Sequence, residues 1–228
     1  MIHYHGTPMT PRSELWKMAG KHFCISFPDH RDTDICFNIG QSIMLDNGAF
    51  SLFTKGLELD LSKFYKLIEP YLGHPHWAVV PDVIDWKEED NLALIKQWPF
   101  RKDCAAVVWH LSEPIDHLSR LKDLNFGMVA FGSSKEYWKI GSEDWKKRIE
   151  EAFNSIVKNG EIPWIHMMRG LSLGGKHYPF SSADSTNVTR HHYKYETAEY
   201  MARQIDSNQC PVKWKIKGVQ KDLIQWKQ

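Results

Sequence analysis

The chain has 228 residues, of which 42% are hydrophobic and 25% are charged, and its formal net charge at pH 7 is +1. This composition is that of a globular protein whose length suits one domain with a substantial core. A net charge this close to zero excludes a global basic field, so any contact with a polyanion must come from a local patch. The sequence has neither the early apolar segment of a signal peptide nor an apolar run of transmembrane length, so we expect a cytoplasmic protein without a membrane partner.

Short apolar segments alternate with helical patterns along the chain. Strands are expected over residues 1–5, 22–27, 42–45, 77–80, 105–109, 126–131, 164–168 and 180–183. Helices are expected over residues 11–19, 61–72, 86–98, 113–121, 143–158 and 193–205, where apolar residues recur at helical spacing. Five of these helices follow a residue with the side chain of an N-cap, namely Thr10, Asp60, Asp85, Ser112 and Ser142.

This alternation predicts an α/β fold in which eight parallel strands close into a (β/α)₈ TIM-like barrel with the helices outside. We expect the barrel domain over residues 1–190 and a short, basic, helical tail over residues 191–228 packed on it. The segments 27–42 and 171–179 have only weak helical patterns. A doubly wound open sheet is the alternative, but no Gly-x-Gly-x-x-Gly segment opens a helix.

Basic and aromatic residues are interleaved in the tail. They are Lys213, Trp214, Lys215, Lys217, Lys221, Trp226 and Lys227, opposed by Asp222. This cluster is the best local candidate for contact with phosphates. A solvated surface is an equally good interpretation, because charged residues often gather at exposed chain ends.

Three of the expected strands lead into an aspartate: Asp46, Asp82 and Asp184. The carboxyl ends of barrel strands meet on one face, which is the catalytic face in barrels of this kind. We therefore expect these carboxylates to converge there with the residues that end the fifth, sixth and seventh strands, which are His110, Gly132 and Arg169. For Asp184 alone, the alternative is a turn or helix cap, since serine and threonine follow it.

Converging carboxylates are suited to two kinds of chemistry. In glycosyl transfer, one carboxylate is the nucleophile and another donates and accepts a proton. Three carboxylates and a histidine could instead bind a divalent cation. Gly48, which follows Asp46 and Asn47, either lets the backbone approach a flat ligand or marks a plain turn.

The four cysteines are widely separated and form no Cys-x-x-Cys pair, which argues against a zinc ribbon and a redox motif. Close histidine pairs occur, but none has a third ligand at metal-binding spacing. We expect no metal and no cofactor, with His191, His192 and Cys210 as the residues that would form a site if one exists.

The order of these residues resembles the tRNA-guanine transglycosylase (queuine tRNA-ribosyltransferase) superfamily, whose members exchange a guanine in nucleic acid for a 7-deazaguanine. The segment from Asp46 to Ser51 is similar to the family's Asp-Ser-Gly-Gly-Phe-Gln motif after the third strand. Asp82 matches the family's base-recognising aspartate, and Phe131-Gly132-Ser133 is similar to its sixth-strand glycine loop. Asp184, followed by Thr189-Arg190, matches its nucleophile in type and spacing. The resemblance covers about residues 1–190.

The chain also departs from the family pattern. His110 stands where the family has a glutamine, and the three-cysteine zinc site that follows the eighth strand has only Cys210 as a counterpart. The chain is much shorter than the tRNA enzymes, and what remains resembles the reduced, phage-type relatives that act on DNA. The resemblance therefore favours DNA over tRNA as the partner polymer, with a free 7-deazaguanine base as second substrate, in the cytoplasm of a phage host.

The resemblance implies roles for individual residues. Asp184 would attack the sugar C1′, Asp46 would move the proton between the two bases, and Asp82 would bind the base together with His110 and the Gly132 backbone. Phe50 would stack on the base, and Gly48, Arg169 and Arg190 would complete the binding site.

Three other interpretations stay open: a tRNA-specific enzyme, a nucleoside or nucleotide glycosidase in which water resolves the intermediate, and a non-catalytic nucleic-acid-binding subunit. Retention of all three aspartates argues against the last.

Overall fold

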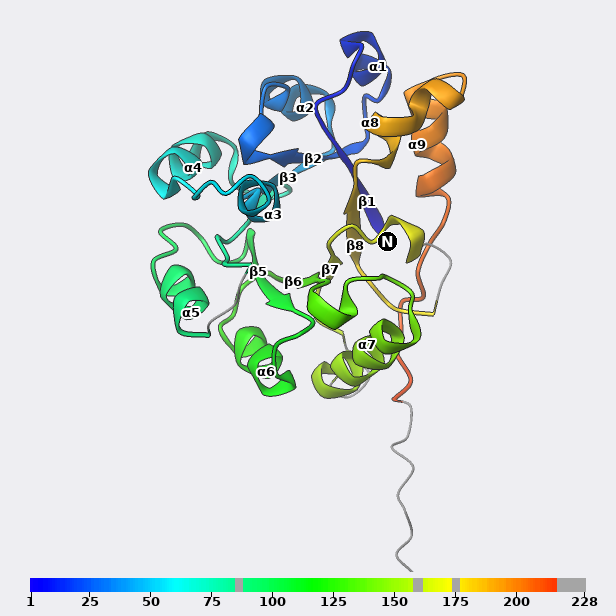
Figure 1. Ribbon diagram of the computed structural model, residues 1–228. Coiled ribbons are helices and arrows are strands. Elements are labelled where there is room, and N and C mark those ends of the chain that lie inside the picture. Colours follow the sequence, from blue (N-terminus) through cyan, green and yellow to red (C-terminus); the bar gives the residue numbers. More distant parts are fainter. Residues whose placement is uncertain (85–87, 158–161, 174–176, 217–228) are drawn as a thin grey trace, which may run out of the picture.

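The computed structural model describes residues 1–84, 88–157, 162–173 and 177–216, and it confirms the predicted barrel. Eight parallel strands pair in sequence order and close through β1 and β8 (Figure 1). They are β1 (Ile2–Gly6), β2 (His22–Ser26), β3 (Ser42–Asp46), β4 (Trp77–Val79), β5 (Ala105–His110), β6 (Met128–Gly132), β7 (Ile165–Met167) and β8 (Ser182–Ser185).

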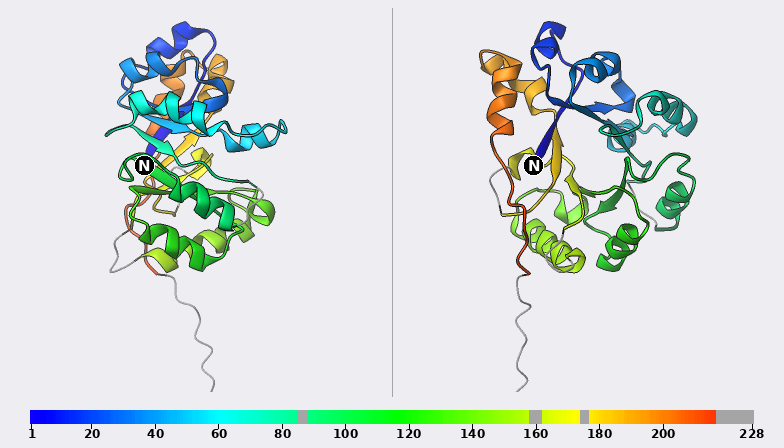
Figure 2. Two further views of the ribbon diagram at one scale, coloured as in Figure 1. Left: turned by 90° about the vertical axis from the view of Figure 1, so that its left-hand side faces the viewer. Right: turned by 180° about the vertical axis from the view of Figure 1, so that it is seen from behind.

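The described helices are α1 (Arg12–Lys17), α2 (Thr33–Ile39), α3 (Ala49–Phe53), α4 (Leu61–Ile68), α5 (Glu88–Lys96), α6 (Ile115–Asp123), α7 (Glu143–Ile156), α8 (Asn187–His191) and α9 (Ala198–Asp206). Single 3₁₀ turns cover Phe27–Asp29, Glu69–Tyr71, Lys135–Tyr137, Leu171–Leu173 and His192–Lys194. Most of the helices surround the ring of strands, as the two views of Figure 2 show. The short α3 instead follows β3 and lies over the carboxyl-end face of the barrel (Figure 1).

Side chains alternate between two apolar layers along each strand, as expected where both faces of a strand are buried. Phe23, Ile25, Ile43 and Leu45 belong to the large cluster between strands and helices. Tyr4, Cys24, Met44, Trp77, Val108 and Ala130 belong to a second cluster inside the barrel. The barrel interior is therefore a packed core, and a cavity can open only at its ends.

Two of the predicted caps are confirmed. The Asp60 carboxylate accepts a hydrogen bond from the Lys63 backbone N–H at 3.0 Å, and the Ser142 hydroxyl accepts one from the Trp145 N–H at 3.3 Å. The caps at Thr10 and Ser112 are wrong. Helix α1 starts after Pro11 without a side-chain cap. The Ser112 hydroxyl pairs with that of Ser134 at 2.9 Å, and α6 starts after Pro114. Asp85 lies outside the described residues.

Several segments differ from the sequence-based expectation, including the unexpected short helices α3 and α8. The connection between β2 and β3 contains a regular helix, α2. The last strand begins at Ser182, two residues later than expected, because Phe180 packs among Phe131 and Phe153 on the helix side of the sheet. The helix expected from residue 193 begins at Ala198, where Thr197 caps the N–H of Tyr200 at 3.0 Å.

The part of the tail that the structure describes is anchored to the barrel. Asp206, at the end of α9, accepts a hydrogen bond from Lys21 at 2.8 Å and lies 2.9 Å from His5 Nε2 on β1. Trp214 is 6% exposed, has its ring near those of Phe153 and Tyr178, and donates to the Asn154 side chain at 2.8 Å. Trp214 is thus a packing residue and not an exposed ring, whereas Lys213 and Lys215 are exposed. Lys217, Lys221, Asp222, Trp226 and Lys227 lie outside the described residues.

Among the described residues, none of the helices has the length and apolar character needed to cross a lipid bilayer.

Candidate active site

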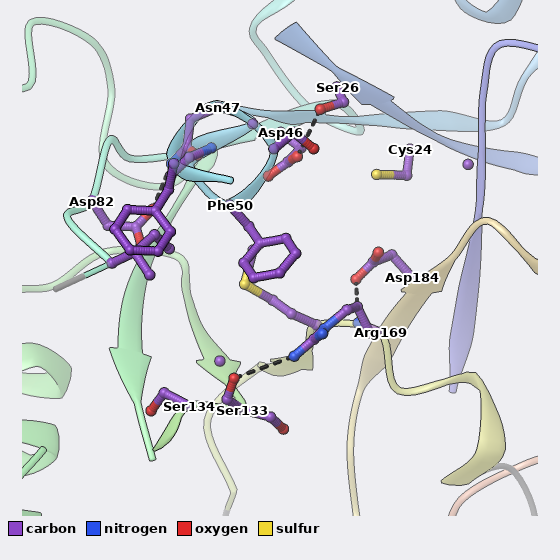
Figure 3. A pocket seen from close by; sticks show the side chains of 18 of the residues that line it. Cys24, Ser26, Asp46, Asn47, Phe50, Asp82, Ser133, Ser134, Arg169 and Asp184 are labelled. Carbon is purple, nitrogen blue, oxygen red and sulfur yellow. Dashed lines mark hydrogen bonds between the residues drawn. The ribbon is translucent and has the colours of Figure 1, made fainter. Parts of the chain in front are cut away.

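A cavity of about 390 Å³ opens at the carboxyl ends of the strands (Figure 3). Eight of the nine residues predicted for the site line it: Asp46, Gly48, Phe50, Asp82, His110, Gly132, Arg169 and Asp184. The ninth, Arg190, is exposed on α8 and is not among the lining residues. A cavity of this size falls in the range that binds small organic ligands, about 300–1,000 Å³.

The alternation of side chains along the strands explains why these residues meet. Met44, Val108 and Ala130 point into the barrel core, so the next inward position on each strand is its last residue. Those last residues are Asp46, His110 and Gly132. Beyond the packed interior, an inward-facing side chain reaches the cavity instead of the core.

One oxygen of Asp184 carries all the hydrogen bonds that described residues make to this side chain. Oδ1 accepts a hydrogen bond from the Arg169 backbone N–H at 2.9 Å and lies 3.2 Å from Nε2 of the buried His166. Figure 3 shows the contact with Arg169 at the edge of the cavity. The other oxygen, Oδ2, therefore keeps its electron pairs for a ligand.

Asp46 is held in an environment that favours its protonated form. Removal from water and the charge of Asp184 raise its pKa to about 7, while the hydroxyl of Ser26, which donates to Oδ2 at 3.1 Å, acts in the opposite direction. A carboxyl group with a pKa near neutrality can both give and take a proton at physiological pH. Asp46 is thus suited to proton transfer, on the same cavity that Asp184 lines.

Asp82 is fixed by one donor on each of its oxygens. Asn47 Nδ2 donates to Oδ1 at 2.8 Å and to the Val80 carbonyl at 3.0 Å, and His110 Nε2 lies 2.8 Å from Oδ2. Burial opposes protonation of His110, but the hydrogen bond and charge of Asp82 outweigh burial and raise the pKa of His110 above its usual value. Each carboxylate oxygen has two acceptor positions, so Asp82 can still accept hydrogen bonds from a ligand.

The two predicted glycines serve close packing of the protein itself. Gly48 has φ +72°, and a Cβ there would lie 2.2 Å from Cδ of Pro28. A Cβ on Gly132 would lie 3.0 Å from Nδ1 of His110. Gly48 therefore allows the turn that starts α3, and Gly132 leaves room for the imidazole that contacts Asp82.

Aromatic rings and a guanidinium group form the mouth of the cavity. The Arg169 guanidinium carbon lies 4.1 Å from the ring centroid of Trp138 and 5.4 Å from that of Phe50, and its Nη2 donates to the Ser133 carbonyl at 3.2 Å. Phe50 is 43% exposed and Trp138 is 49% exposed. Flat, partly exposed rings beside a cation form a surface on which planar groups can stack.

Residues of the site that were not selected from the sequence include Ser26, Asn47, Trp138 and His166. Asn47 stands inside the predicted motif, but its bond to Asp82 joins segments 35 residues apart. His166 is the polar residue in the middle of a short apolar strand, which was the available signal. Trp138 follows a 3₁₀ turn whose position the sequence did not indicate.

Among the described residues, no group of three or more His, Cys, Asp or Glu side chains is placed to hold a metal ion. His192 Nδ1 lies 3.1 Å from the Val188 carbonyl, and the Cys210 thiol contacts the Leu173 carbonyl at 3.4 Å. All four cysteines are free and buried.

A barrel of this kind supports many reactions, so the fold alone does not identify one. Comparison of the chain with protein-family models, curated proteins and solved structures finds no match. The resemblance to tRNA-guanine transglycosylases therefore depends on the sequence of this chain alone.

Proposed function

We propose that the protein is a base-exchange transglycosylase that replaces a guanine in nucleic acid, DNA in preference to tRNA, with a 7-deazaguanine. The observation that carries the proposal is that one cavity brings together Asp184, with a free oxygen, and Asp46, with a pKa near 7. Asp82 and His110 lie on the same cavity and supply the base-binding groups.

The proposed reaction consists of two displacements at one carbon. In the first, Oδ2 of Asp184 forms a bond to C1′ of the nucleotide while the C1′–N9 bond breaks, and the departing guanine takes its proton from Asp46. In the second, the incoming base gives its N9 proton to Asp46, and N9 attacks C1′ as the bond to Asp184 breaks. Two displacements retain the configuration at C1′, and Asp46 returns to its starting state.

The base-binding end of the site follows from the chemistry of guanine. The N1–H and exocyclic amine of guanine are adjacent donors, and Asp82 offers carboxylate acceptors held in place by Asn47 and His110. A target base in a duplex must leave the stack to reach such a cavity. The ring of Phe50 at the mouth supplies a stacking surface for it.

Incubation of the protein with radiolabelled guanine or 7-deazaguanines and either duplex DNA or tRNA tests the proposal. We expect label to enter the DNA. Label in tRNA alone would identify a tRNA enzyme, and release of free guanine without incorporation would identify a glycosidase. The absence of both labelling and base release with every polymer would contradict an enzymatic role.

Replacement of His110 with glutamine is expected to change the choice of incoming base. His110 lines the cavity and contacts Asp82 through its Nε2 atom. The glutamine amide ends in both a donor and an acceptor, whereas a single imidazole nitrogen stands at this contact. The relative kcat/KM values for 7-substituted deazaguanines should change by about 10-fold or more while guanine exchange stays measurable. An equal loss for every base would show that His110 has a general role and not a selective one.

Replacement of Lys213 and Lys215 with alanine is expected to weaken binding to DNA at all sequences if these exposed lysines contact phosphates. The slope of log affinity against log salt concentration should fall by about 0.9 for each duplex phosphate that the variant no longer neutralises. A double alanine variant of Lys63 and Lys66, exposed on α4, removes the same charge and is the control. Equal slopes in both double variants would show that the tail lysines are solvated and do not contact phosphates.

A further inference from the structure

A continuous set of hydrogen bonds leads through the barrel wall to the oxygen of Asp184 that is not free. Trp164 Nε1 donates to the Ser182 hydroxyl at 3.0 Å, and the same hydroxyl lies 2.9 Å from His166 Nδ1. His166 Nε2 lies 3.2 Å from Asp184 Oδ1. The residues come from the two neighbouring strands β7 and β8 and from the residue that precedes β7.

The hydrogen-bonding capacity of each group determines where the protons lie. An indole N–H is only a donor, so the Ser182 oxygen accepts from Trp164 and keeps its own proton to donate. An ionised carboxylate is only an acceptor, so the nitrogen of His166 beside Asp184 carries a proton. Nε2 is thus the donor to Asp184, and Nδ1 accepts the proton that Ser182 keeps to donate. Every donor in the set then has an acceptor.

Packing prevents the imidazole of His166 from turning. The side chain is fully buried, with its ring 5.1 Å from that of Trp77 and 6.1 Å from that of Tyr4, both in edge-on contact. A rotated ring would break both of its hydrogen bonds in a buried site, and an unmade buried hydrogen bond is costly. His166 is therefore a rigid donor aimed at one oxygen.

We propose that His166 is a positioning residue that, with the Arg169 backbone N–H, holds Oδ1 of Asp184 and thereby presents Oδ2 to C1′. The proposal rests on the proposed function, because it assigns the attacking oxygen of that reaction. The same two donors suit both displacements, since Oδ1 accepts their hydrogen bonds as part of a carboxylate and as the carbonyl oxygen of the glycosyl ester.

Four variants separate positioning from packing. His166→Leu removes the donor at similar volume, and His166→Gln keeps an amide N–H. Ser182→Ala removes the partner of Nδ1. The control is His22→Gln, because His22 also packs against Tyr4 and also pairs with a serine, Ser42 at 2.7 Å, but makes no contact with Asp184.

The first measurement is the rate at which a covalent protein–nucleic acid adduct forms in a single turnover. We expect about a 10²-fold loss in His166→Leu, in line with the cost of a misplaced reacting group, and no more than a few-fold loss in His22→Gln. His166→Gln should recover most of the rate, and the KM for the free base should stay near the wild-type value. A folded His166→Leu variant with the wild-type adduct rate would overturn the proposal.

The second measurement does not depend on the reaction. Long-range ¹H–¹⁵N spectra of histidine-labelled protein should show a neutral ring protonated at Nε2, assigned by its loss in His166→Gln. That signal should move in Asp184→Ala and Ser182→Ala and stay in place in His22→Gln. A ring protonated at Nδ1 alone would refute the arrangement. If the wild type forms no adduct but the spectra are as expected, the proposed function fails while the contact between His166 and Asp184 stands.

Discussion

Replacement of Asp184 with asparagine is expected to abolish the covalent adduct and to lower base exchange by several orders of magnitude. Asparagine keeps the shape of the side chain and an oxygen for the Arg169 N–H, but it has no anionic oxygen to attack C1′. Loss of a nucleophile removes the intermediate itself and not only the assistance to its formation. The expected effect is therefore the largest of any single substitution in the cavity.

Denaturing gel electrophoresis and peptide mass analysis of wild type, Asp184→Asn and Asp46→Asn after incubation with DNA measure this effect. The wild-type adduct should map to the peptide that contains Asp184. Thermal unfolding of each variant is the control for folding. An adduct on Asp46, or one that persists in Asp184→Asn, would reverse the two roles, and full exchange by Asp184→Asn would exclude the assignment.

Replacement of Asp46 with asparagine is expected to slow exchange by about 10² to 10⁴, the usual contribution of general acid–base catalysis. Expulsion of guanine needs the protonated carboxyl, which prevails below a pKa of about 7, so this step should slow as the pH rises above 7 in the wild type. The amide introduced by Asp46→Asn cannot titrate, so that alkaline decline should disappear from the variant. An adduct can still accumulate slowly, since bond cleavage and proton transfer are partly separable.

Ser26→Ala gives this prediction a matched control. The Ser26 hydroxyl lowers the pKa of Asp46, so its removal should raise that pKa and shift the alkaline decline to higher pH. The pH profile of the single-turnover adduct rate measures both variants. A decline that stays in Asp46→Asn, or that moves to lower pH in Ser26→Ala, would assign the titration to another group.

The same pKa has a consequence for stability, measured by denaturant unfolding at several pH values. In the folded protein the pKa of Asp46 is about 7, above its ordinary value of 3.8, so the folded state binds more protons than the unfolded state between these limits. Stability contributed by the protonated group is complete below about pH 4 and is lost as the pH rises towards 7 and beyond. Asp46→Asn should therefore gain stability over the wild type across this interval, by on the order of 1 kcal/mol or more, since one pKa unit corresponds to about 1.4 kcal/mol.

The sequence alone was sufficient for the order of the strands and for the residues that end β3 and β5. Strands such as β3 and β5 are largely buried on both faces and appear as apolar runs, and the polar residue that ends each of these runs marks the end of the strand. Asp46 and His110 were placed in this way, and both line the cavity. Local chemistry also predicted the caps at Asp60 and Ser142, because a cap depends on residues within one turn.

Features that depend on distant segments were decided by the tertiary structure. Ser112 pairs with Ser134 from the next strand end instead of capping a helix, and the start of β8 depends on where the Phe180 ring packs. The raised pKa of Asp46 arises from burial and from the charge of Asp184, which is far away along the chain. The sequence by itself thus determined the barrel and the kinds of group at its mouth. Which oxygen of Asp184 is free and the raised pKa of Asp46 were decided only by the closed barrel, because hydrogen bonding and desolvation depend on distances that no local pattern encodes.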